Sequence, residues 1–183
     1  MTRNDAYSIL TEFTKNPNLI KHGLAVEAAM RRYAEIYKED VGTWEIVGLL
    51  HDFDYEIHPT LEEHPQKGVE MLRKRGVSED ILHGILAHAP HTGEPRDSLM
   101  KKTVFAVDEL SGFIIAVALV RPNKKLAEVT VEAVMKKLKS PAFAAKVNRE
   151  EITQGAAELA LPLETHIGSV LAALQSSASV LGL

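Results

Sequence analysis

The chain has 183 residues, and we predict one domain over residues 1–183. Hydrophobic residues make up 45% and charged residues 25%, which excludes a disordered or collagen-like chain. Because the net charge is −4, we expect neither a nucleic acid polymer nor a membrane as a partner. The absence of cysteine excludes disulfides, thiolate metal sites and a cysteine nucleophile, so any metal must bind His, Asp and Glu.

The first residues lead into no apolar stretch of the signal-peptide type. A helix that spans a bilayer needs about 20 apolar residues, and the longest apolar run here, residues 113–120, is far shorter. We therefore expect a cytoplasmic protein.

Helical periodicity runs through nearly the whole chain, and strand-like alternation is hard to find. Apolar residues recur at three- and four-residue spacings after Asn16, and Thr43 is predicted to cap a helix that ends at His51 and Asp52. Residues 53–63 are predicted to form a loop. The helices predicted in this part of the chain cover about residues 17–37, 43–50, 64–75, 78–88 and 98–120.

The last of these segments, residues 98–120, is strongly apolar and is predicted to be the central buried helix, with Asp108 as its one acid in a buried position. Three more helices are predicted over about residues 124–139, 148–161 and 163–177. We expect the helices within residues 124–180 to pack on a core formed by about residues 17–122, and a homodimer stays open as an alternative use of their apolar faces. These patterns predict an all-α, single-domain helix bundle.

Four residues stand out as candidate metal ligands. His51 and Asp52 are adjacent at the end of an apolar helix, where packing needs neither of them, and His22 lies in the preceding amphipathic helix. The carboxylate of Asp108 lies inside the most apolar helix, where it is costly unless it is paired or binds a metal. Two imidazoles and two carboxylates predict a site for Mn, Fe, Co, Ni, Zn or Mg.

The order of these four residues resembles the HD-domain superfamily of metal-dependent phosphohydrolases, in which a His precedes a His-Asp doublet and a distant Asp. The resemblance covers about residues 17–120. It rests on His22, on the doublet in Gly-Leu-Leu-His-Asp-Phe-Asp and on Asp108 in Phe-Ala-Val-Asp-Glu-Leu. The region beyond resembles a group of small bacterial predicted HD-superfamily hydrolases.

Two further histidines extend the resemblance to the dinuclear branch of this superfamily. His64 in Glu-Glu-His-Pro and His88 in Ile-Leu-Ala-His-Ala-Pro stand where that branch carries its additional ligands, and His91 is an alternative to His88. By this resemblance Asp52 would bridge two divalent cations. The implied ligand set is His22, His51, Asp52, His64, His88 and Asp108.

The resemblance implies an enzyme that hydrolyses a phosphomonoester or phosphodiester of a small phosphorylated metabolite or nucleotide. The metals would lower the pKa of a bound water and stabilise charge on the phosphoryl oxygens. Asp52 would fix the spacing of the metals and orient the hydroxide, and Asp54 is predicted as a second catalytic residue. Glu56 is a further accessory candidate, and the candidates for phosphate binding are Lys67, Arg73 and Arg96.

Departures from the superfamily narrow the expected chemistry. The chain lacks the glycine and lysine that follow the doublet in the cyclic-dinucleotide phosphodiesterases, which argues against cyclic-di-GMP as a substrate. Asn18 stands where some of those proteins carry an acid for a third metal, so we expect at most two metals. The alternatives to a hydrolase are a di-iron oxygenase with the same ligands and a metal- or nucleotide-binding module without catalysis.

Overall fold

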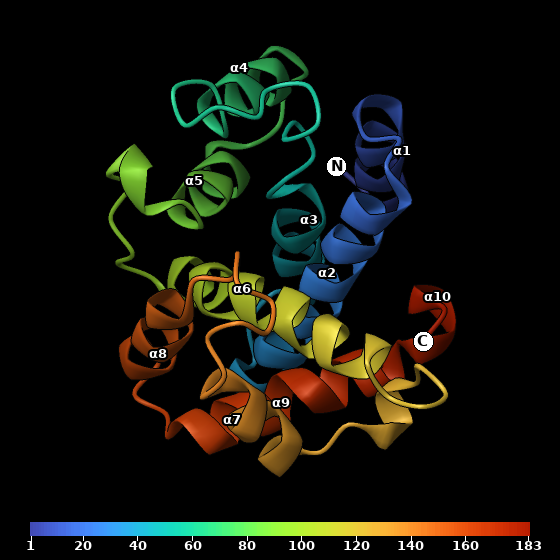
Figure 1. The fold of residues 1–183 in the computed structure, drawn as a ribbon. Helices are drawn as coiled ribbons and strands as arrows, with labels where there is room; N and C mark the ends of the chain where they lie inside the picture. The colour runs from blue at the N-terminus through green and yellow to red at the C-terminus, as the bar shows by residue number, and fades with distance from the viewer.

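A computed structural model describes all residues, 1–183, and its regular secondary structure consists only of helices (Figure 1). The predicted all-α class is confirmed. None of the helices combines the length and the apolar composition that crossing a bilayer requires. In chain order, the elements are α1 (Arg3–Phe13), α2 (Pro17–Tyr37), α3 (Val41–Leu50), α4 (Gln66–Lys74), α5 (Glu79–Ala87), the 3-10 helix η1 (Pro90–Thr92), α6 (Leu99–Leu119), the 3-10 helix η2 (Leu126–Glu128), α7 (Val131–Leu138), α8 (Arg149–Glu158), α9 (Leu163–Ser176) and α10 (Ala178–Leu181).

Helix α6 crosses the middle of the molecule, with α3, α4 and α5 on one side and α7 and α9 on the other (Figure 1). It is the central buried helix that the sequence predicts, and Phe105, Leu110 and Phe113 on it are buried. Helix α2 contacts α3, α6 and α9, so it connects the two sides. Helices α2, α3 and α6 therefore form the framework that positions His22, His51, Asp52 and Asp108.

Helix α3 lies unusually close to α2 at Gly48. A Cβ atom on this glycine would lie 2.9 Å from the Cα atom of Glu27, closer than real Cβ atoms approach a backbone. The glycine thus lets the two helices meet without a side chain between them. This close approach brings the C-terminal end of α3, which carries the His-Asp doublet, next to α2.

Two predicted helix starts are corrected by the structure. Asp40 caps α3, because its carboxylate accepts hydrogen bonds from the backbone N–H and the hydroxyl group of Thr43, and the helix begins before Thr43. The helix predicted from residue 64 begins at Gln66. The preceding His64 therefore lies outside the regular hydrogen-bonding pattern of α4.

The helix predicted for residues 124–139 is divided in the structure into η2 and α7. The side chain of Thr130 accepts a hydrogen bond from the N–H group of Ala133 and caps α7. Three consecutive β-branched residues, 129–131, disfavour a continuous helix at this point. The sequence interpretation also missed α1, whose start is a reciprocal capping box between Thr2 and Asp5.

A buried histidine ties α9 to the framework helices. The Nε2–H group of His166 donates to the carbonyl oxygen of Ala106 at 2.9 Å, and the hydroxyl group of Tyr33 donates to His166 Nδ1 at 2.6 Å. Both side chains are buried, and burial lowers the pKa of His166. A neutral imidazole satisfies both hydrogen bonds, so His166 has a structural role and links α9 to α2 and α6.

Candidate metal centre

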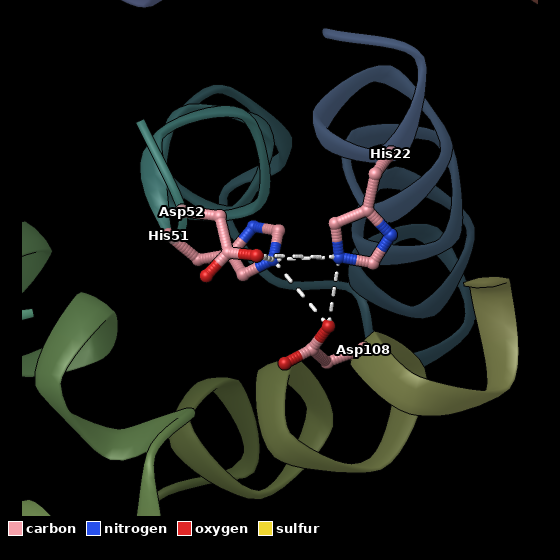
Figure 2. A group of neighbouring side chains, drawn as sticks. All are labelled: His22, His51, Asp52 and Asp108. Atoms are coloured by element: carbon pink, nitrogen blue, oxygen red, sulfur yellow. Dashed lines mark hydrogen bonds and ion pairs between the residues drawn. The ribbon is translucent and has the colours of Figure 1, made fainter. Parts of the chain in front are cut away.

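Helices α2, α3 and α6 bring four side chains of the predicted site together (Figure 2). His22 Nε2 lies 2.9 Å from Asp108 Oδ1 and 3.1 Å from His51 Nε2. His51 Nε2 lies 3.4 Å from the same Asp108 oxygen. Asp52 Oδ2 lies 3.6 Å from His22 Nε2 and 3.5 Å from His51 Nε2. We call these four residues the first ligand group.

Asp52 also faces a second ligand group, which it forms with His64 and His88. Its Oδ1 atom lies 3.1 Å from His64 Nε2 and 3.4 Å from His88 Nε2, and these two nitrogens are 3.2 Å apart. Each oxygen of the Asp52 carboxylate is thus turned to a different group of ligands. The bridging role implied by the resemblance requires this arrangement.

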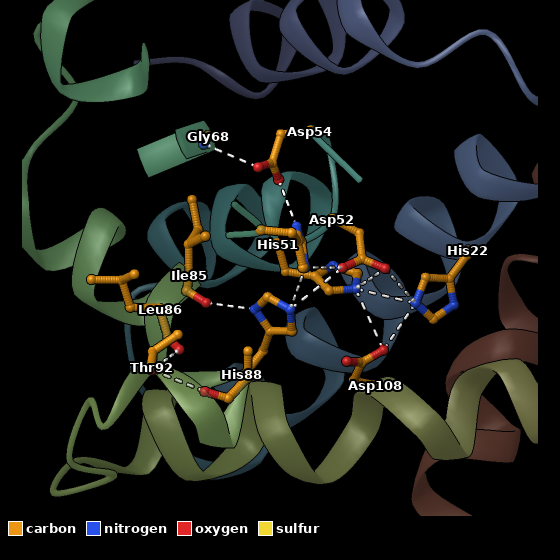
Figure 3. Close-up of polar contacts among 12 residues, drawn as sticks. His22, His51, Asp52, Asp54, Gly68, Ile85, Leu86, His88, Thr92 and Asp108 are labelled. Atoms are coloured by element: carbon orange, nitrogen blue, oxygen red, sulfur yellow. Dashed lines mark hydrogen bonds and ion pairs between the residues drawn. The ribbon is translucent and has the colours of Figure 1, made fainter. Parts of the chain in front are cut away.

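Two of the histidines are oriented by carbonyl groups of the helices that end at them. His51 Nδ1 donates to Gly48 O at 2.7 Å. His88 Nδ1 donates to Ile85 O at 2.6 Å (Figure 3). An imidazole that donates from Nδ1 keeps the lone pair of Nε2 for another partner when it is neutral. Both lone pairs therefore point into the ligand cluster.

The donor set fits divalent cations. His64 donates from Nδ1 to Asp54 Oδ1 at 2.9 Å, so in the neutral imidazole the Nε2 lone pair faces the Nε2 atom of His88 across 3.2 Å. Two lone pairs at this distance repel one another unless a proton or a cation interacts with both nitrogens. Imidazole nitrogens beside carboxylate oxygens match the preferences of Mn, Fe, Co, Ni and Zn.

The charges within the cluster shift the pKa values of its members. Burial lowers the pKa of His51, but the carboxylates of Asp52 and Asp108 together outweigh burial and raise it to about 9. Burial likewise opposes charge on His64, and the Asp52 and Asp54 carboxylates raise its pKa to about 9. Binding of a cation must displace protons from these histidines, so affinity for metal falls at low pH.

The carboxylates respond in the opposite direction. Burial alone would raise the pKa of Asp52 and of Asp108, but the neighbouring histidines lower both. These two groups are therefore ionised and available as ligands. Glu109, which sequence reasoning did not single out, differs: burial and the adjacent Asp108 raise its pKa to about 7.

One side of the cluster is open to solvent. The side chain of His51 is 0% exposed, whereas the side chain of Asp52 is 21% exposed. His22 and Asp108 are each 19% exposed, similar to Asp52. His22, Asp52 and Asp108 therefore form the solvent-accessible part of the cluster, and the buried histidines His51, His64 and His88 form its floor.

Asp54 lies behind the cluster and not in this opening. It is 0% exposed, and its oxygens accept from His64 Nδ1 and from the N–H group of Gly68. The catalytic role predicted for Asp54 stays a prediction, and the structure places its carboxylate behind the ligand His64. His91 also lies outside the ligand group: its Nε2 atom donates to His64 O at 2.8 Å.

The other accessory candidates have partners of their own. Arg73 makes a two-point interaction with the carboxylate of Glu79, and Arg96 does the same with Glu158, so neither guanidinium group is free for phosphate. Glu56 accepts backbone hydrogen bonds from residues 15 and 16. The exposed amino group of Lys67 lies 3.9 Å from Glu70.

Comparison with known proteins gives a family match over the region that carries the ligands. The HD domain matches residues 19–113, just over half of the chain. Ribonuclease Y of Nitratidesulfovibrio vulgaris is 31% identical over 103 residues, which are 56% of this chain and 19% of that protein. Ribonuclease Y of Geobacter sulfurreducens is 34% identical over 96 residues, 52% of this chain and 18% of that protein. The chain thus spans about a fifth of the length of these relatives, and no solved structure matches it.

Proposed function

This chain belongs to the HD domain family, and we propose that it hydrolyses a phosphoester of a small phosphorylated metabolite or nucleotide with the aid of two divalent cations. The observation that carries this proposal is the orientation of Asp52, which turns one carboxylate oxygen toward each ligand group. A site for a single cation would need only one of these groups.

In this proposal the ligand groups have separate tasks. His22, His51 and Asp108 hold one cation, His64 and His88 hold the other, and Asp52 contributes to both. Bound cations supply a water of lowered pKa and stabilise the negative charge that develops on a phosphoryl group. The chain itself fixes the ligand atoms, excludes water from the floor of the site and leaves one side open for the substrate.

Recognition of the phosphoryl group depends on the cations in this account. The two arginines that the sequence offers for phosphate binding are held by Glu79 and Glu158. The open side of the site carries the carboxylates of Asp52 and Asp108, which repel an anion in the metal-free protein. We therefore expect phosphate or a product analogue to bind only after metal has been added.

The names of the relatives bear on the substrate. Ribonuclease Y is named for an action on RNA, which favours a phosphodiester bond as one form to test in this chain. The net charge of −4 provides no general attraction for a long polyanion, so we propose a short or small substrate. A substrate screen should therefore include a short oligoribonucleotide as well as small phosphomonoesters and phosphodiesters.

The test uses metal-stripped protein that is resupplied separately with Mn, Co, Ni, Mg, Zn or Fe. The substrates are p-nitrophenyl phosphate, bis(p-nitrophenyl) phosphate, nucleotides and a short oligoribonucleotide. We expect phosphoester cleavage that requires metal and is lost in Asp52→Ala, whereas Asp97→Ala, a change at an exposed acid, keeps it. Protein that binds metal but cleaves none of these would contradict the proposal. Oxygen uptake by the iron form would then identify an oxygenase.

A further inference from the structure

A buried carboxylate outside the second ligand group, that of Asp54, contacts His64, one of the ligands in the group. We propose that Asp54 is a positioning residue, which holds the imidazole of His64 in the orientation and the tautomer that the second cation needs. This inference rests on the proposed two-cation site. It assigns to Asp54 a role in binding metal at one of the two positions.

Both oxygens of Asp54 have defined partners. Oδ1 lies 2.9 Å from His64 Nδ1, and Oδ2 lies 3.0 Å from the backbone nitrogen of Gly68. The side chain is 0% exposed, so water does not compete for either hydrogen bond. Figure 3 shows the carboxylate beside Gly68, on the far side of the cluster from Asp108. Its position is therefore fixed from one side while it orients His64 on the other.

Gly68 leaves the space that Asp54 occupies. A Cβ atom at this position would lie 2.5 Å from the carboxyl carbon of Asp54 and 2.7 Å from Oδ2. The N–H group of Gly68 belongs to the first turn of α4, where backbone donors have no partner within the helix. Pro65, at the N-cap position, provides no side-chain acceptor for these donors. The carboxylate of Asp54 accepts from the N–H group of Gly68 instead, and its negative charge is favourable at a helix N-terminus.

His64 differs in this respect from the other buried ligands. His51 and His88 each donate from Nδ1 to a backbone carbonyl group, whereas His64 donates to a carboxylate. A negative acceptor makes the opposite nitrogen of an imidazole a stronger ligand, and loss of such a partner typically lowers metal affinity 10- to 100-fold. The second position should therefore depend on Asp54 more than the first.

The substitution Asp54→Asn tests this dependence with little change of volume. An amide that accepts from His64 turns its NH₂ group toward the N–H group of Gly68, which places two donors against each other. The opposite orientation turns the NH₂ group toward His64 Nδ1 and favours the tautomer whose proton is on Nε2. Either orientation weakens the support of His64 as a ligand.

The experiment is a calorimetric titration of metal-free protein with Mn²⁺, which gives the number of bound ions and the affinity of each. We expect the wild type to bind two ions. In Asp54→Asn the affinity for the first ion should stay unchanged, and the affinity for the second ion should fall at least about 10-fold. Glu56→Gln is the matched control, because it removes a carboxylate from the same segment but keeps an acceptor for residues 15 and 16. It should bind both ions as the wild type does.

A second pair of variants separates positioning from a merely structural effect. Gly68→Ala keeps Asp54 but displaces its carboxylate, so the second ion should weaken here as well. In a His64→Ala background, Asp54→Asn should leave the affinity of the remaining ion unchanged, because the residue acts through His64. If Asp54→Asn weakens the remaining ion in that background, Asp54 only supports the fold and the proposal fails.

The outcomes also separate this inference from the proposed function. Two ions bound by the wild type, with selective weakening of one in Asp54→Asn, supports the inference even if no phosphoester is cleaved. Equal affinities in Asp54→Asn and the wild type overturn it even if the protein is a hydrolase. A wild type that binds only one ion overturns both the inference and the two-cation site.

Discussion

The two ligand groups share Asp52 but are supported by different parts of the fold. The first group lies on α2 and α6 and directly after the last residue of α3, and these three helices form the framework of the molecule. In the second group, His64 precedes the start of α4 and His88 follows the end of the short helix α5. Core packing thus determines where the first group lies, whereas the second also depends on a local clamp, the Asp54 carboxylate between His64 and Gly68.

Asp52→Ala should have the largest effect, because it removes the carboxylate that connects the two groups. We expect turnover to fall by about a thousandfold or more, since the charge stabilisation supplied by bound metal amounts to several kcal/mol. The measurement is the rate of phosphoester cleavage at saturating Mn²⁺. Activity and metal content close to those of the wild type would show that Asp52 is not a ligand shared by two cations.

His64→Ala should distinguish the contributions of the two ligand groups to metal binding and turnover. It removes a ligand from the second group and none from the first, so turnover should fall by about a hundredfold while one cation still binds. The same assay at increasing Mn²⁺ concentration measures this. If His64→Ala removes all bound metal, the first group does not form a site by itself.

Gly48→Ala should disturb the framework beneath the first group. The added Cβ atom would meet the backbone of Glu27, which cannot move without separating α2 from α3, and overpacking of this kind costs about 1–3 kcal/mol. Urea unfolding of the metal-free protein measures the loss. Gly112→Ala on α6 is the control: its Cβ atom would lie 3.8 Å from His22 Nδ1, an ordinary contact, so stability should stay equal or rise. Equal stability of both variants would contradict the close approach.

The pH dependence of stability should distinguish His166 from the ligand histidines. Burial lowers the pKa of His166 below its ordinary value of 6.5, so the unfolded chain binds a proton more readily, and this residue makes stability fall as the pH drops below about 6.5. The pKa values of His51 and His64 are raised to about 9, so in the metal-free protein they contribute stability that is lost as the pH rises from about 6.5 to 9.

The His166→Gln variant isolates the first of these contributions. Between pH 6.5 and 5, its unfolding free energy should change with pH less steeply than that of the wild type, by at most about 1.4 kcal/mol per pH unit. Urea unfolding at several pH values gives the two slopes. Identical slopes would show that His166 titrates in the folded protein as it does in the unfolded chain.

The first ligand group could be predicted from the sequence because its signals are local. An adjacent His-Asp pair at the end of an apolar helix and one carboxylate within the buried face of α6 are visible in the order of residues. The second group could be predicted only from the resemblance to a known family. His88 and His91 are alternatives in the sequence, and only the fold shows that His88 faces Asp52 whereas His91 donates to His64 O.

The role of Asp54 and the partners of the arginines could not be predicted, because they depend on tertiary contacts. Glu158, the partner of Arg96, lies 62 residues further along the chain. Asp54 is two residues beyond Asp52, a spacing that suggests a shared site, but its carboxylate is turned toward the start of α4. The all-helical class was predictable from periodicity, whereas the division of residues 124–139 depended on competition between a threonine cap and helix continuation.

In the proposed site Asp52 connects two metal positions, and the number of Mn²⁺ ions bound per chain tests this connection. Equilibrium dialysis with elemental analysis gives this number for the wild type, His64→Ala and Asp52→Ala at the same free Mn²⁺ concentration. We expect two ions, one ion and no tightly bound ion, respectively. A wild type that binds one ion, or an Asp52→Ala variant that still binds two, would contradict it.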